Sequence, residues 1–173
     1  MSRRHLLLVG LSGAGKTTVG RLAAARLGGP FVDLDAEVER RAGKSVRRIF
    51  AEDGEPVFRT HEAACARDAL AGPPLILAAG GGYFEGEANR SWARAAGLAV
   101  YLSVGIEAAV SRLAGGEDRP LLGGADTAAR LRELLERRET GYLEADHTVV
   151  TDARTPEAVA DEVASLARRH GGW

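Results

Sequence analysis

The chain has 173 residues, a length typical of one compact domain with an ordinary core. The formal net charge is −1, with 27% charged and 45% hydrophobic residues, so composition gives no electrostatic case for binding nucleic acid or an anionic membrane surface. No stretch approaches the length of a membrane span, and the single cysteine excludes an internal disulfide and suits a reducing compartment. We therefore expect one domain over residues 1–173 and a location in the cytoplasm. A monomer is our working expectation and does not follow from these observations.

Short apolar runs alternate with helical patterns along the whole chain. Strands are expected at 6–9, 31–34, 75–79, 98–102 and 148–151. Helices are expected at about 16–27, 36–42, 46–52, 56–71, 87–96, 106–114, 126–144 and 156–169. This alternation predicts an α/β domain whose parallel sheet is covered by helices on both faces.

The run that follows the first predicted strand, Gly10–Thr17, fits the phosphate-loop pattern G-x-x-x-x-G-K-[ST]. Its glycines let the backbone curl so that N–H groups face an anion, and the N-terminus of the next helix adds favourable partial charge. Lys16 can then reach the β- and γ-phosphates, and the Thr17 hydroxyl can ligate Mg²⁺. A glycine-rich turn without a ligand is the alternative. The predicted nucleotide-binding residues are Gly13, Ala14, Gly15, Lys16, Thr17 and Thr18.

Two carboxylates end the second predicted strand. The period of two along a strand turns Asp33 and Asp35 toward the same side, near the phosphate loop at the carboxyl edge of the sheet. One could help hold Mg²⁺, and the other could accept a proton from an acceptor hydroxyl. In the alternative interpretation Asp35 is the N-cap of the helix at 36–42, and Asp33 is a solvated strand end.

Arg59 lies in the first turn of the helix predicted at 56–71. A cation at this position opposes the helix dipole, at a cost of roughly 0.3–1 kcal/mol. A bound anion would explain the placement. The alternative is a surface arginine that pairs with Glu55 or Glu62.

Arg138 shares an apolar stripe of the helix predicted at 126–144 and has no acid one turn away, whereas its neighbour Arg137 has Glu133. An arginine on an apolar stripe must find its anion on another element. That anion could be a protein carboxylate in a structural ion pair, or a carboxylate or phosphate of a substrate.

Two glycine-rich segments follow strands or helices of the predicted sheet. Gly80–Gly82 would let backbone approach a ligand closely and would offer N–H donors, although a plain turn could use fewer glycines. The segment Gly115–Gly124 has a composition suited to a loop that moves as a unit, with Arg119 placed to close over a γ-phosphate. The alternatives are an ordinary surface loop and a pairing of Arg119 with Glu117 or Asp118.

These features describe an ATP site beside a second site that suits a small anionic polyol. Their order along residues 5–156 resembles the shikimate kinase family, within the nucleoside-monophosphate-kinase-like group of P-loop proteins. The motifs that carry the resemblance are the phosphate loop, Phe31–Asp35, Ile49-Phe50, Gly54-Glu55, Phe58-Arg59, Glu62, Gly80–Gly82, Arg119–Leu122, Arg138 and Tyr142.

The resemblance implies a three-layer P-loop kinase fold with a five-stranded parallel sheet in the order 2-3-1-4-5 and helices on both faces. It implies an acceptor-binding region at about 34–62 and a mobile lid at about 114–125. The implied reaction is transfer of the γ-phosphoryl group of ATP, with Mg²⁺, to the 3-hydroxyl of shikimate in aromatic amino acid (chorismate) biosynthesis. ATP and shikimate are the implied partners.

The resemblance also implies roles for single residues. On the acceptor side, the residues that would bind shikimate are Asp35 (also the favoured base), Arg59, Gly81 and Arg138, with Phe50, Phe58 and Glu62 lining or bracing the pocket. On the nucleotide side, Asp33 would support Mg²⁺ through water, Arg119 would reach the phosphates from the lid, and Arg112 and Pro156 would flank adenine.

Two other functions stay open at this point. One is a kinase of another small hydroxy acid such as gluconate, and the other is a non-catalytic nucleotide-binding regulatory module. A regulatory module would need no acceptor clamp, and a gluconate site is not expected to show this order of acceptor motifs.

Overall fold

The computed structural model describes residues 2–114 and 126–173. Its strands form one parallel sheet in the order β2-β3-β1-β4-β5, which confirms the expected topology. From one edge to the other the strands are β2 (Phe31–Asp33), β3 (Ile76–Ala78), β1 (His5–Val9), β4 (Gly97–Ser103) and β5 (His147–Val150).

The central strand β1 is buried along its whole length. Its side chains alternate between the two faces of the sheet, as the period of two requires. Leu6 and Leu8 pack into one hydrophobic core, whereas Leu7 and Val9 pack into the other. A strand that is apolar on both faces needs helices on both sides, which is the three-layer arrangement predicted from the sequence.

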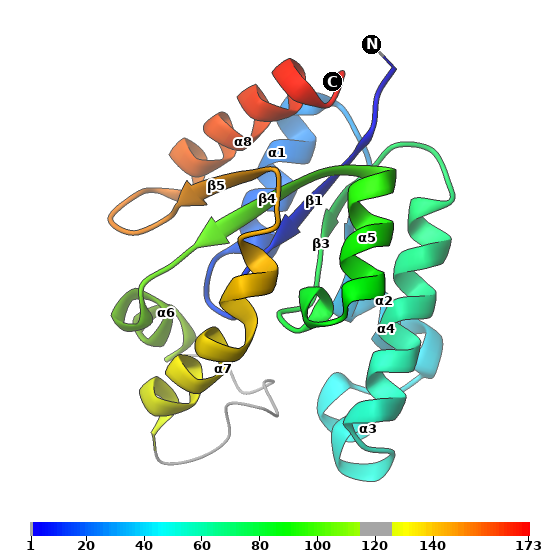
Figure 1. Cartoon of the computed structure of the whole chain (residues 1–173), viewed down its shortest axis with the longest axis vertical. Coiled ribbons are helices and arrows are strands. Elements are labelled where there is room, and N and C mark those ends of the chain that lie inside the picture. Colours follow the sequence, from blue (N-terminus) through cyan, green and yellow to red (C-terminus); the bar gives the residue numbers. More distant parts are fainter. Residues whose placement is uncertain (1, 115–125) are drawn as a thin grey trace.

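Helices cover both faces of the sheet (Figure 1). The first core is covered by α1 (Lys16–Leu27), α6 (Ile106–Leu113) and α8 (Pro156–His170). The second is covered by α2 (Leu34–Ala42), α3 (Val46–Glu52), α4 (Glu55–Leu70), the short 3₁₀ helix η1 (Tyr83–Glu85) and α5 (Glu87–Ala96). Helix α7 (Thr127–Tyr142) contributes to both, with Leu131 in the first core and Tyr142 in the second.

The junction between β2 and α2 differs from the sequence-based prediction. Asp33, and not Asp35, is the N-cap: its Oδ1 accepts a hydrogen bond from the Ala36 N–H at 3.2 Å. The helix therefore begins at Leu34, and Asp35 lies in its first turn. The two carboxylates are not alternate residues of one strand, because the capping bond bends the chain into the helix directly after Asp33.

The two ends of the described chain meet beside the sheet (Figure 1). The Arg4 N–H donates to the Gly171 carbonyl at 2.9 Å, and the Trp173 indole N–H donates to the Arg4 carbonyl at 2.8 Å. In the described part of the chain, no helix is both long enough and apolar enough to cross a membrane. The lid expected at about 114–125, with Arg119, lies outside the described residues except for Ala114.

Candidate active site

The phosphate loop joins β1 to α1, and its backbone conformation requires glycine at several positions. Gly13 and Gly15 have φ angles of +84° and +90°, in the region that favours glycine. A Cβ on Gly13 would also lie 2.9 Å from the Ala109 carbonyl oxygen of α6. Lys16, the first residue of α1, folds back over the loop and donates through Nζ to the carbonyls of Gly10 at 2.7 Å and Leu11 at 3.0 Å. The cation is thus held at the mouth of the loop.

Thr17 and Asp33 place two hard oxygen ligands side by side. The Thr17 hydroxyl donates to Asp33 Oδ2 at 2.5 Å, while Oδ1 caps α2. Hydroxyl and carboxylate oxygens are the donors that Mg²⁺ accepts, and Mg²⁺ typically takes only one or two protein groups beside the phosphates of its substrate. The pair fits that requirement. Within the described residues no group of three or more His, Cys, Asp or Glu side chains could hold a metal ion by itself.

A cavity of about 410 Å³ opens above the phosphate loop and runs along the carboxyl edge of the sheet. This is the position at which open α/β sheets collect their ligands. The predicted site residues that line it are Gly13, Ala14, Gly15, Lys16, Thr17, Thr18, Asp33, Asp35, Gly81, Arg112 and Pro156. Arg59 and Arg138 are not in the wall of this cavity and lie against Gly80–Gly82, as described below.

One end of the cavity is formed by α6 and the segment after β5. Arg112 donates to the Gly13 carbonyl at 3.2 Å, to the Thr151 hydroxyl at 3.0 Å and to the Thr151 carbonyl at 2.9 Å, which ties these segments together. Arg154 also lines this end and donates to Glu162 at 2.7 Å. Sequence reasoning missed Arg154, although a cation just beyond the carboxyl end of a parallel strand is a recognisable signal.

At the other end, two carboxylates converge on Gly80. A Cβ on this glycine would lie 2.1 Å from Glu62 Oε1 and 3.0 Å from Asp35 Oδ1. Glu62 has no exposed surface. Burial raises the pKa of Glu62 to about 7, because the favourable charge of Arg59 does not offset desolvation and the nearby Asp35 disfavours a second negative charge.

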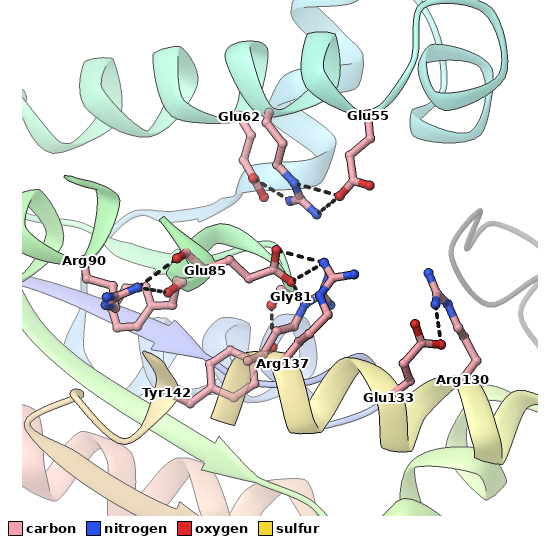
Figure 2. Close-up of polar contacts among 12 residues, drawn as sticks. Glu55, Glu62, Gly81, Glu85, Arg90, Arg130, Glu133, Arg137 and Tyr142 are labelled. Atoms are coloured by element: carbon pink, nitrogen blue, oxygen red, sulfur yellow. Dashed lines mark hydrogen bonds and ion pairs between the residues drawn. The ribbon is translucent and has the colours of Figure 1, made fainter. Parts of the chain in front are cut away.

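Arg59 is held by two glutamates of its own helix. Its Nη1 donates to Glu62 Oε2 at 2.7 Å, and its Nη2 and Nε donate to Glu55 Oε1 at 3.0 and 3.3 Å. The pairing considered as the alternative is therefore present; Figure 2 shows both glutamates on α4. The same guanidinium faces the glycine run, because a Cβ on Gly82 would lie 2.3 Å from Nη2.

Arg138 finds its anion on another element, as its place on the apolar stripe of α7 predicted. The residue is 2% exposed, and its Nε donates to Glu85 at the end of η1. Arg137 also donates to Glu85, at 3.0 and 3.1 Å, and it acts on Glu133, one turn away, through its charge. Glu133 pairs with Arg130 at 2.6 Å. Glu85 was missed because nothing in a short 3₁₀ helix marks which acid reaches α7.

Comparison with known proteins decides between the families that could use such a site. A family model described as shikimate kinase matches residues 12–168. The chain belongs to the shikimate kinase family. The shikimate kinase of Pseudomonas syringae pv. syringae is 46% identical, over 95% of this chain and 95% of its own length. That of Ruegeria pomeroyi is 44% identical, over 96% of this chain and 86% of its own length.

Solved structures agree with this family assignment. Shikimate kinase from Acinetobacter baumannii in complex with shikimate superposes with a TM-score of 0.93 at 35% identity, over 97% of this chain and 94% of its own. A gluconokinase from Sinorhizobium meliloti gives 0.68 at 19% identity, over 98% and 94%, which shows the fold alone. The chain is accordingly a kinase with the function of the shikimate kinase family, and neither a gluconate kinase nor a non-catalytic module is favoured.

Proposed function

We propose that the chain transfers the γ-phosphoryl group of ATP to the 3-hydroxyl of shikimate, giving shikimate 3-phosphate and ADP. The observation that carries this proposal is that one continuous cavity runs from the phosphate loop to Gly80 and Gly81, with Asp35 in its wall. Two arginines lie against the same glycine run. A cavity of this kind can hold a phosphoryl donor and a carboxylate-bearing acceptor next to each other.

The donor half would be formed by the phosphate loop. Its N–H groups and Lys16 would hold the β- and γ-phosphates, and Arg112, Pro156 and Arg154 would line the adenine end. When bound, Mg²⁺ neutralises charge on the phosphates. The Thr17 hydroxyl would ligate it, with Asp33 contributing directly or through water.

The acceptor half would be formed by the glycine run and the side chains around it. Arg59 and Arg138 would bind the carboxylate of shikimate, and the Gly81 backbone would contact the acceptor. Asp35 would orient the 3-hydroxyl and accept its proton as the hydroxyl oxygen attacks the γ-phosphorus and the bond to the β-phosphate oxygen breaks. Arg119, from the lid at about 114–125 outside the described residues, would close over the phosphates.

We also infer a monomer in the cytoplasm. The free thiol of Cys65 is buried, which suits a reducing environment. Large apolar side chains with substantial exposure are few on the described surface and belong to different segments of the chain. They are Val57, Trp92, Leu143 and Val150.

A coupled assay of ADP release tests the proposal. The acceptors are shikimate, quinate, gluconate and nucleoside monophosphates, each with ATP and Mg²⁺. Shikimate is expected to raise ADP release far above the ATP-only background, and EDTA is expected to abolish that rise until Mg²⁺ is restored in excess. A rate with shikimate no higher than background, or a larger response to gluconate, contradicts the proposal.

A further inference from the structure

Arg138 is buried, and the anion that pairs with it comes from another element. A guanidinium that is 2% exposed needs an anion, because an unpaired buried charge is strongly destabilising. The positions one turn away on α7 carry no acid. The anion comes from Glu85, which accepts from Arg138 Nε and from Arg137 Nη2. One carboxylate thus serves two arginines of α7.

Glu85 is held in place by contacts of its backbone neighbours. Arg90 of α5 donates to the carbonyls of Phe84 at 2.7 Å and Glu85 at 2.9 Å. On the opposite side, α7 approaches so closely that a Cβ on Gly141 would lie 2.5 Å from the Phe84 carbonyl oxygen. The Tyr142 hydroxyl donates to the Gly81 carbonyl (Figure 2). These contacts fix η1 between α5 and α7, so the position of the carboxylate is fixed too.

The contact with Glu85 determines which edge of the Arg138 guanidinium can bind something else. A guanidinium can bind a carboxylate side-on, through Nε and one terminal nitrogen, or end-on, through both terminal nitrogens. Glu85 occupies Nε. Nη2 is buried and has no hydrogen-bond partner among the described residues, and Nη1 lies 3.3 Å from the Cβ position of Gly81, a residue of the cavity wall. Only the end-on mode is open.

Charge sharing keeps Arg138 able to attract an anion. Burial alone would raise the pKa of Glu85, but the hydrogen bonds and charges of Arg138 and Arg137 outweigh it and hold the pKa below its ordinary value. The carboxylate is therefore ionised at neutral pH. Two guanidinium groups share this one negative charge, so Arg137, Arg138 and Glu85 together carry a net charge of about +1, to which the partly ionised Glu62 facing Arg138 adds a smaller negative contribution.

We propose that Glu85 is a positioning residue for the acceptor. It fixes Arg138 so that the carboxylate of the acceptor binds end-on to the two terminal nitrogens of the guanidinium. Arg137 neutralises part of the negative charge of Glu85, so that Arg138 still attracts this carboxylate. The inference rests on the proposed function, because it takes the anion at Arg138 to be the carboxylate of shikimate. A purely structural ion pair is the competing explanation, and it predicts no selective effect on the acceptor.

Comparison of shikimate with its methyl ester separates these explanations, because the ester lacks the carboxylate charge. Glu85→Ala is expected to raise the KM for shikimate on the order of tenfold, with the KM for ATP and the kcat/KM for the ester within about twofold of wild type. Glu85→Gln keeps an acceptor oxygen for Nε and is expected to recover most of that loss. Asp68→Ala, which removes the exposed partner of Arg41, is the control and is expected to change nothing.

Arg137→Ala keeps the test decisive if Glu85→Ala does not fold, because Arg137 is a half-exposed surface residue. Its removal leaves the Glu85 charge to Arg138 alone and is expected to raise the KM for shikimate about threefold, and that for the ester not at all. The inference is overturned if both variants change the kinetic constants for shikimate and for the ester equally, or change neither. Arg138→Ala separates the role of Glu85 from the proposed role of Arg138. If this variant still prefers shikimate over the ester, Arg138 does not bind the carboxylate and the proposed function of Arg138 is wrong as well. If the inference is overturned but this variant loses the preference, only the role of Glu85 is wrong.

Discussion

Glu62 is a carboxyl group whose surroundings oppose its charge. It is fully buried on α4 and faces Arg59 from its own helix, Asp35 from α2, Arg138 from α7 and Tyr83 from η1. Burial is the largest influence and raises its pKa to about 7. The group that braces Arg59 therefore changes its ionisation near neutral pH.

The pH dependence of stability follows from this shift. Because the folded pKa of about 7 lies above the ordinary value of 4.5, the folded protein binds more protons than the unfolded chain between these values. The stabilising contribution of Glu62 is therefore complete below about pH 4.5 and is lost as the pH rises through about 7. Urea unfolding of wild type and Glu62→Gln between pH 5 and 8 should show wild type losing stability relative to the variant. A difference that is constant, or that grows with pH in favour of wild type, contradicts the assignment.

Single residues show where sequence reasoning stops. Asp33 and Asp35 could be placed at the site because they follow a strand at the carboxyl edge of the sheet, and Arg112 because of the family resemblance. The structure puts all three in the wall of one cavity. The N-cap role of Asp33 was missed because residues 33 and 35 are both plausible caps in the sequence. Glu85 could not be found, because its partners Arg137 and Arg138 are distant in the chain and only the packing of η1 on α7 joins them.

At the scale of elements, the glycine run between β3 and η1 lies between the charged side chains of α4 and Arg138 of α7. Gly80 and Gly82 have no room for a Cβ beside Glu62 and Arg59, and a Cβ on Gly81 would be a tight 3.3 Å from Arg138 Nη1. The sequence predicted close approach of this backbone to a ligand. The structure adds that charged side chains already occupy the space in which a Cβ would stand at Gly80 and Gly82.

Gly80→Ala tests this close packing. The new Cβ would lie 2.1 Å from Glu62 Oε1, and Glu62 cannot move without disturbing its hydrogen bond to Arg59. We expect a loss of about 1–3 kcal/mol in the free energy of unfolding and a raised KM for shikimate. Gly72→Ala is the control, since its nearest neighbour, the Ala69 carbonyl oxygen, is at an ordinary 3.5 Å. Chemical denaturation and steady-state kinetics measure both effects, and equal stabilities of the two variants argue against tight packing at Gly80.

The elements themselves were largely readable from the sequence, with ends that differ by a few residues. β4 spans Gly97–Ser103 where 98–102 was expected, and α7 spans Thr127–Tyr142 where 126–144 was expected. Apolar periodicity identifies the interior of an element, but its ends depend on capping bonds and tertiary contacts. The short helix η1 has too few residues to show any period at all.

For the whole molecule, the alternation of strands and helices was enough to predict a parallel sheet with two covered faces. The strand order came from the family resemblance, because apolar runs do not encode which strand lies beside which. The strand order places two glycine-rich segments side by side. The central strand β1 is followed by the phosphate loop, and its neighbour β3 is followed by the glycine run. The phosphate loop and the glycine run, which we propose as the donor and acceptor regions, thereby line one cavity.

The central claim is that the protein transfers the γ-phosphoryl group of ATP, bound in this cavity, to one hydroxyl of shikimate. Phosphorus NMR of a reaction mixture with ATP, Mg²⁺ and shikimate tests it most directly, because a phosphate ester couples to the proton on its own carbon. We predict ADP and one new phosphate monoester in equal amounts, with the ester coupled to the proton on carbon 3. Inorganic phosphate in place of an ester, or an ester on another hydroxyl, would contradict the account.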